Sequence, residues 1–179
     1  GEFISTTLNT PPYMYAVIFA AGLVAQVLFD TTLVTAMAAL TVWGLVALYA
    51  LTTGQFFFVD THIPIAVFLG MNLLITDPAT SPRSLCGRAL FGASYGLMVL
   101  PLWTSLQSIG QPAFFDKLLQ VPLLNLCVPL FERIGHIMDR GIRDRPWIVH
   151  NRLHVGIWCA AFAVLYGGLV AHEGRDPDY

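Results

Sequence analysis

The sequence predicts an all-α integral membrane protein with about six transmembrane helices. Of its 179 residues, 56% are hydrophobic and only 11% are charged, whereas an ordinary soluble domain is about 25% charged. The charges are also segregated. Residues 3–29, 31–59 and 89–115 carry none, while charges gather in 77–88 and 132–152. Long uncharged stretches separated by charged loops are typical of a chain that crosses a bilayer several times.

Apolar windows of about 20 residues place the six helices along the chain. The first and second form a tight hairpin at Asp30, and the third is short. In order, the expected helices are 12–29, 32–51, 62–75, 88–105, 114–131 and 153–170. Gly92 and Gly96 stand four residues apart in the fourth helix, a spacing that lets a neighbouring helix approach closely.

The fifth helix is expected to be irregular because it contains Gln120, Pro122, Asn125 and Pro129. Proline inside a membrane helix frees backbone carbonyls, which must then find partners in neighbouring protein rather than in lipid. We therefore expect this helix to pack inside the bundle.

The arginines predict the orientation. Most basic residues fall in loops on one side of the six spans, and only Lys117 and Arg175 fall on the other. By the positive-inside rule the arginine-rich loops face the inner side of a bacterial-type inner membrane, and both termini lie outside. The inner residues are Arg83, Arg88, Arg133, Arg140, Arg143, Arg145 and Arg152.

Residues 134–152 are expected to form an amphipathic linker on the inner face. Phe131, Ile134, Ile137 and Met138 recur at helical spacing, and charged residues lie between them, which predicts a helix along the membrane surface. Such a helix is either a docking site for a partner or lipid headgroups, or simply a solvated helix end. Residues 153–179 then form the last helix and a short tail.

A turn-forming segment lies between the third and fourth helices. Thr76, Asp77 and Pro78 are expected to end the third helix, and Pro82 delays the next one. An acid at the membrane edge is costly unless it is paired. We therefore predict an ion pair between Asp77 and an arginine, most simply Arg88.

The same segment reads I-T-D-P-A-T-S-P, with Thr80 within it, followed by G-R-A-L-F-G. These two strings resemble a segment of a known family, the membrane proteins called D in Rnf complexes and B in the sodium-translocating NADH:quinone reductase. L-L-N-L-C-V-P-L-F-E-R, which holds Asn125 and Pro129, is similar to the family's last helix. The resemblance implies that residues 1–133 form a five-helix half of a urea-transporter-like inverted-repeat fold, to which one extra helix is added.

Family members active in electron transfer carry FMN on a threonine in an S-G-A-T-type motif, and this sequence has no such motif. Thr80 follows Ala79 but belongs to the T-D-P segment, so we do not expect it to carry flavin.

Cys86, Cys127 and Cys159 are too scattered for an iron–sulfur cluster. All five histidines are expected at or beyond helix ends, where His150 and His154 at i, i+4 are better explained as interfacial residues than as metal ligands. Asp60 and His62 are better explained as anchors of the outer end of the third helix than as steps of a proton or cation path.

The leading functional prediction is therefore a non-catalytic membrane subunit of a larger electron-transport or respiratory-type complex, whose partners are the lipid bilayer and other membrane subunits. One alternative is an electron carrier that binds flavin or quinone non-covalently, with Trp43, Phe56, Phe57, Phe58 and Trp103 as stacking groups. A further alternative is half of a small-solute channel. A net charge of -2 and the lack of a basic stripe argue against nucleic acid.

Overall fold

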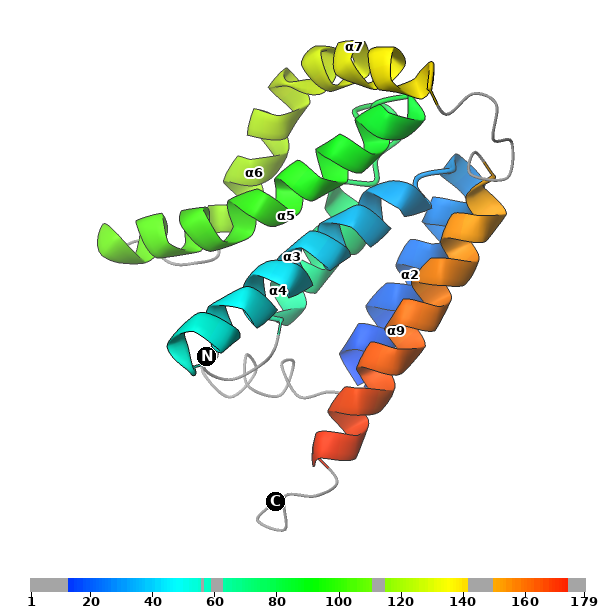
Figure 1. The fold of residues 1–179 in the computed structure, drawn as a ribbon. Helices are drawn as coiled ribbons and strands as arrows, with labels where there is room; N and C mark the ends of the chain where they lie inside the picture. The colour runs from blue at the N-terminus through cyan, green and yellow to red at the C-terminus, as the bar shows by residue number, and fades with distance from the viewer. Residues whose placement is uncertain (1–12, 56, 59–62, 111–114, 142–149, 174–179) are drawn as a thin grey trace.

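The computed structural model describes residues 13–55, 57–58, 63–110, 115–141 and 150–173 (Figure 1). Within these ranges the chain is all-helical, which confirms the predicted class of secondary structure. The helices are α2 (Tyr13–Phe29), α3 (Thr32–Thr53), α4 (Ile65–Leu69) with the π-helix η1 (Gly70–Leu74), α5 (Leu85–Ser108), α6 (Phe115–Leu126), α7 (Val128–Asp139) and α9 (Asn151–Glu173).

The helices run up and down a bundle (Figure 1). α2, α3, the α4–η1 segment, α5, α6 and α9 alternate in direction, and α7 lies across the end where α5 begins. The first residue of α2 and the last residue of α9 consequently lie at the same end, opposite α7. α2 and α9 are neighbours, joined by the stacked rings of Phe19 and Phe162, whose centroids are 3.8 Å apart.

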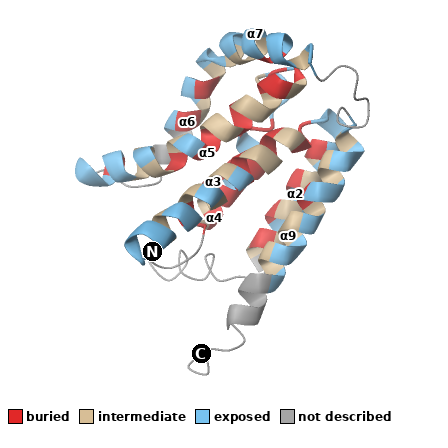
Figure 2. Cartoon of the chain, in the orientation of Figure 1, coloured by how far each residue is buried: buried red, intermediate tan, exposed pale blue. Residues whose placement is uncertain are grey.

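The centre of the bundle is the contact between α3 and α5 (Figure 2). Val34, Ala38 and Val42 of α3 are fully buried there. A Cβ atom added to Gly92 would overlap the carbonyl group of Val34, and one added to Gly96 would crowd the Ala38 carbonyl. These two glycines therefore let the helix backbones touch, as their spacing predicts.

The predicted fifth helix is two helices. α6 ends at Leu126, and α7 begins again after a turn at Cys127, with Pro129 in its first turn, where a residue without an N–H is tolerated. The expectation that this region is irregular is confirmed. The expectation that it packs inside the bundle is wrong, because α6 packs on α5 along one side only and leaves Leu126 80% exposed.

Two helices in the described part of the chain, α3 and α5, are long and apolar enough to cross a bilayer. Met14–Phe29 and Ile65–Leu74 are shorter apolar helices. The second of these begins later than expected, and its second half forms wider π-helical turns around Asn72. The predicted start of this helix at His62 lies outside the described residues.

Gly92→Ala should destabilise the bundle strongly, because the new methyl group meets the backbone of α3 rather than a flexible side chain. Gly44→Ala on α3 is the matched control, since a Cβ there meets nothing within 4 Å. Alanine at that position should stabilise its helix by about 1 kcal/mol. Thermal unfolding of both variants in detergent measures this difference, and a gain in midpoint for Gly92→Ala would contradict the close packing of α3 and α5.

Candidate functional site

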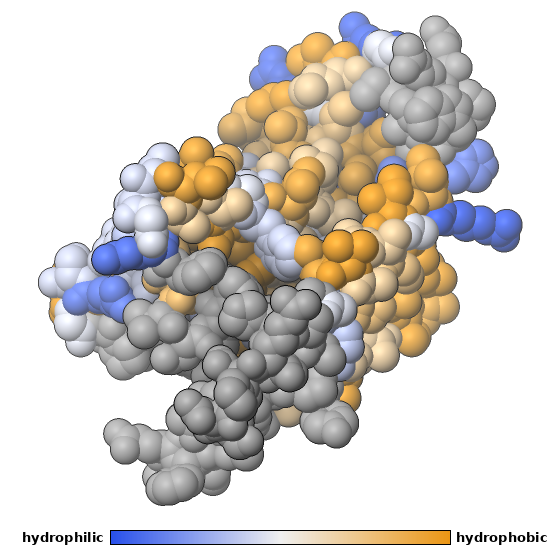
Figure 3. Space-filling model, turned by 60° about the horizontal axis from the view of Figure 1, so that its bottom comes forward, coloured by the Kyte–Doolittle hydropathy of each residue, from blue (hydrophilic) through white to orange (hydrophobic). Residues whose placement is uncertain are grey.

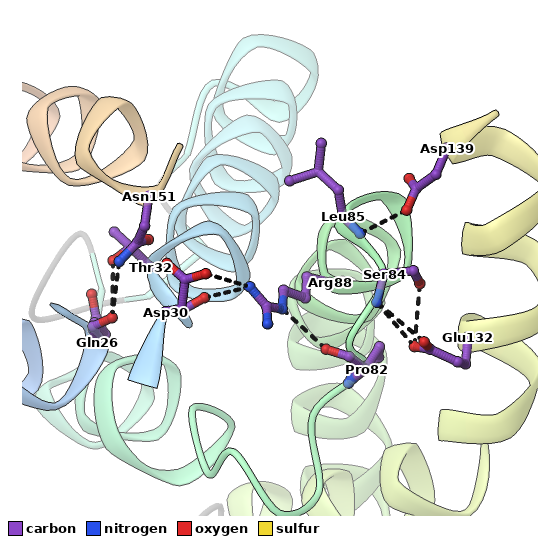
Figure 4. A network of polar contacts seen from close by, with 10 residues as sticks. All are labelled: Gln26, Asp30, Thr32, Pro82, Ser84, Leu85, Arg88, Glu132, Asp139 and Asn151. Carbon is purple, nitrogen blue, oxygen red and sulfur yellow. Dashed lines mark hydrogen bonds and ion pairs between the residues drawn. The ribbon is translucent and has the colours of Figure 1, made fainter. Parts of the chain in front are cut away.

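One group of polar contacts in the described chain lies where α5 begins (Figure 4). Two carboxylates from α7 bind the backbone there. Glu132 accepts hydrogen bonds from the N–H groups of Arg83 (2.7 Å) and Ser84 (3.2 Å) and from the Ser84 hydroxyl (3.2 Å). Asp139 accepts from the N–H groups of Leu85 and Cys86, both at 2.9 Å. Between them, the two acids bind four consecutive N–H groups.

These hydrogen bonds satisfy N–H groups of the kind that are left unpaired at the start of every helix. The first N–H groups of a helix have no partner within it, and they attract negative charge. Ser84 occupies the N-cap position of α5 but makes no capping bond with its own side chain. α7 supplies the acceptors instead. Gly135 allows α7 to come this close, because a Cβ atom at that position would overlap the Ser84 hydroxyl and the Gly87 backbone.

The surroundings of Glu132 favour its ionised form. Partial burial on its own raises the pKa of this carboxyl. The N–H groups of Ser84 and Arg83, the Ser84 hydroxyl and His136 outweigh that effect and lower the pKa below its ordinary value of 4.5. His136 lies one turn along α7, with its Nε2 atom 3.0 Å from a Glu132 oxygen.

The predicted ion pair between Asp77 and Arg88 is wrong. Arg88 donates from Nη1 to the Asp30 carbonyl oxygen at 2.6 Å and lies 3.4 Å from its carboxylate, while its Nε donates to the Pro82 carbonyl at 3.1 Å. Arg88 thus joins the start of α5 to the turn between α2 and α3 (Figure 4). Asp30 has a positive φ of 62° in that turn, which aspartate tolerates better than most residues.

Asp77 instead makes hydrogen bonds within its own loop. Its carboxylate accepts from the Ala79 N–H at 3.0 Å and from the Thr80 hydroxyl at 3.3 Å. Its carbonyl accepts from the Thr80 N–H and from the Ser81 hydroxyl. A carboxylate bound within the turn does not require the distant arginine. The Thr80 hydroxyl is also engaged in this turn.

A second polar cluster is buried between α2, η1 and α9. Gln26, fully buried, donates from its amide to the Asn72 side-chain and carbonyl oxygens at 3.2 and 3.3 Å. Asn151 donates to the Gln26 carbonyl at 3.3 Å (Figure 4). Thr76 is buried and donates to the Asn72 carbonyl at 3.0 Å. These amides join three helices that are far apart in the sequence.

The other motif residues are divided between the two polar regions and the outer helices. The Pro82 carbonyl belongs to the Arg88 network, whereas Pro78 is exposed in the loop. Asn125 lies on α6 and Pro129 in the first turn of α7. The buried Asn125 Oδ1 atom has no hydrogen-bond partner among the described residues.

Three of the candidate stacking aromatics, Phe57, Phe58 and Trp103, form one group of contacting rings. Phe58 packs edge-to-face against both Phe57 and Trp103, with centroids 4.9 and 5.1 Å apart, and Trp43 packs against the core. Phe56, Asp60 and His62 lie outside the described residues. No group of three or more histidine, cysteine, aspartate or glutamate side chains within the described ranges is placed to hold a metal ion.

The chemistry of the site is structural. Its acids and its arginine are bonded to backbone groups of neighbouring segments, so they hold helices together. Sequence reasoning missed Asp30, Glu132 and Asp139 as members, and it missed the Gln26–Asn72–Asn151 cluster. The seven-residue interval between Glu132 and Asp139 is a signal that places both on one face of α7.

Arg88→Ala should lower the free energy of unfolding by about 1.5 kcal/mol, because two backbone carbonyls lose a charged donor. Asp30→Gly keeps the carbonyl, removes only a partly exposed carboxylate, and suits the positive φ, so its cost should stay below about 0.5 kcal/mol. Thermal unfolding in detergent compares the two variants. An Asp77→Ala variant as destabilised as Arg88→Ala, with no added loss in the double variant, would restore the rejected pair.

Glu132 should make stability depend on acid pH. Since its pKa is lowered in the folded protein, its contribution is complete above pH 4.5 and is lost as pH falls through the folded value. The difference in unfolding midpoint between the parent and Glu132→Gln should therefore shrink from about pH 6 to about pH 3. The exposed Arg140→Gln variant is the control and should follow the parent. A pH-independent difference would contradict capping by the ionised carboxylate.

Comparison with known proteins adds no relative to this geometry. No protein-family model, no curated protein and no solved structure matches the chain. The resemblance to the Rnf D and quinone reductase B family therefore stays a prediction.

Proposed function

We propose that this chain is a membrane-embedded, non-catalytic subunit of a larger electron-transport assembly. The observation that carries the membrane part is the amount of apolar side chain that the fold leaves uncovered (Figure 3). Large apolar residues face outward on helix after helix, among them Val24 on α2, Leu40 and Leu51 on α3, Leu97 on α5 and Val164 on α9. Water does not stabilise such a surface, whereas lipid tails do.

α3 and α5 give the sharpest form of this argument. Helices of their length and composition also occur in the cores of soluble proteins, but there they are mostly buried. Only 33% of the apolar window of α3 and 39% of that of α5 are buried inside the bundle. The exposed part of both windows supports a lipid-facing role for α3 and α5. It also supports insertion of the other apolar helices beside these two, as in a multi-pass protein.

The distribution of charge supports the proposed orientation. Arg83 and Arg88 at the start of α5, Arg133 on α7, Arg140 at its C-cap, and Arg152 at the start of α9 all belong to the same end of the bundle. In an inner membrane this end would face inward. Arg143 and Arg145 lie outside the described residues.

The non-catalytic role is supported by what the polar side chains do. Glu132, Asp139 and Arg88 bind backbone groups of neighbouring segments, and the Thr80 hydroxyl binds Asp77. These bonds suit a subunit that presents a stable surface to others. The assignment to electron transport rests on the sequence resemblance of residues 60–133.

Purification of the tagged chain in mild detergent tests this function. We expect other membrane subunits with redox cofactors to co-purify in fixed ratio, and we expect no flavin fluorescence from the separated, denatured chain. Thr80→Ala is the matched control for a covalent flavin. Purification alone with stoichiometric flavin or quinone would establish the carrier alternative instead. Purification alone without a cofactor would reject the complex and favour the channel.

A further inference from the structure

The acidic residues and the arginines of α7 lie on different faces of the helix. Glu132 and Asp139 lie two turns apart on the face that caps α5, where both bind backbone N–H groups. Arg133 and Arg140, also two turns apart, are exposed. The negative charges of this helix are thus used within the fold, and the charges that it presents outward are basic.

The outward face of α7 is also apolar. Leu130, Ile134, Ile137 and Met138 are exposed, Ile137 by 62%, and at helical spacing they form one stripe with Arg133 and Arg140 along one of its edges. Figure 2 shows this helix exposed along its outer side. A helix with an apolar stripe and a basic border fits the interface of a membrane, where apolar side chains enter the acyl boundary and arginines reach the headgroups.

The position of α7 agrees with that interface. It lies across the first turn of α5, one of the two helices long enough to cross a bilayer. The end of such a helix falls near the headgroups when the helix spans the membrane. The inference therefore rests on the membrane insertion that we propose as part of the function.

We propose that α7 is an in-plane interfacial helix whose Arg133 and Arg140 bind the phosphates of anionic phospholipids. Charge complementarity selects anionic over zwitterionic lipid, because the capping bonds withdraw Glu132 and Asp139 from the outer face. Leu130, Ile134, Ile137 and Met138 lie in the acyl boundary beside them. α7 is held at this depth by the same two carboxylates that cap α5.

Native mass spectrometry of protein released from mixed phosphatidylglycerol and phosphatidylcholine bilayers measures the lipid preference. Arg133→Gln and Arg140→Gln should each reduce the ratio of bound phosphatidylglycerol to phosphatidylcholine about fivefold. Arg152→Gln on α9 is the matched control and should leave the ratio near that of the parent. An unchanged ratio in the double variant, with helicity retained, would overturn the assignment, as would an equal effect of Arg152→Gln.

A fluorophore on Ile137→Cys, quenched by brominated lipids, reports the depth of α7, and one on Gly44→Cys of α3 reports insertion of the bundle. Both labels are placed in a background without the native cysteines. We expect quenching at both positions. Quenching at position 44 alone would leave the proposed membrane subunit standing and overturn the interfacial helix in favour of a protein partner. Quenching at neither position would reject membrane insertion itself.

Discussion

The start of α5 is the constraint on which the rest of the structure depends. Its first N–H groups face no partner within the helix, and in a chain with 11% charged residues few acceptors exist to satisfy them. Glu132 and Asp139 accept from three of these groups, those of Ser84, Leu85 and Cys86, and from the N–H of Arg83 just before the helix, although both acids lie about 50 residues further along the chain. To bring them there, the chain must turn at Cys127, cross α5, and bring Gly135 against Gly87.

The crossing of α7 over the start of α5 also determines which residues of α7 face outward. Had α6 continued straight beyond Leu126, the residues of α7 would extend away from the end of α5 instead of lying across it. The break directs the acids toward α5, and the opposite apolar stripe, with Arg133 and Arg140 beside it, necessarily faces outward. The same backbone turn therefore both caps the central helix and creates the surface that we assign to anionic lipid.

Much of the fold follows from the sequence, because apolar length and charge segregation are local properties. The first two helices are predicted to within about two residues, a usual uncertainty for helix ends, and the glycines of α5 identify the face that packs on α3. The partners of the charged residues could not be predicted in this way. Arg88 has an acid 11 positions before it in Asp77, yet it binds Asp30, which is 58 positions away. Arg88 and Asp30 meet only because the α2–α3 turn lies beside the start of α5 in the fold. The spacing of residues in the sequence does not predict this contact.

The interior shows which forces hold such a bundle. In the membrane setting that we propose, apolar burial drives helix association only weakly, so close backbone packing and hydrogen bonds carry more of the specificity. Gly92 and Gly96 supply the packing between α3 and α5, and the amides of Gln26 and Asn72 join α2 to η1 in a region without charge. Asn72 makes this contact from within the π-helical segment η1 and also donates to the Phe68 carbonyl one turn earlier. These hydrogen bonds thus hold the helices in their positions relative to one another, while many large apolar side chains face outward.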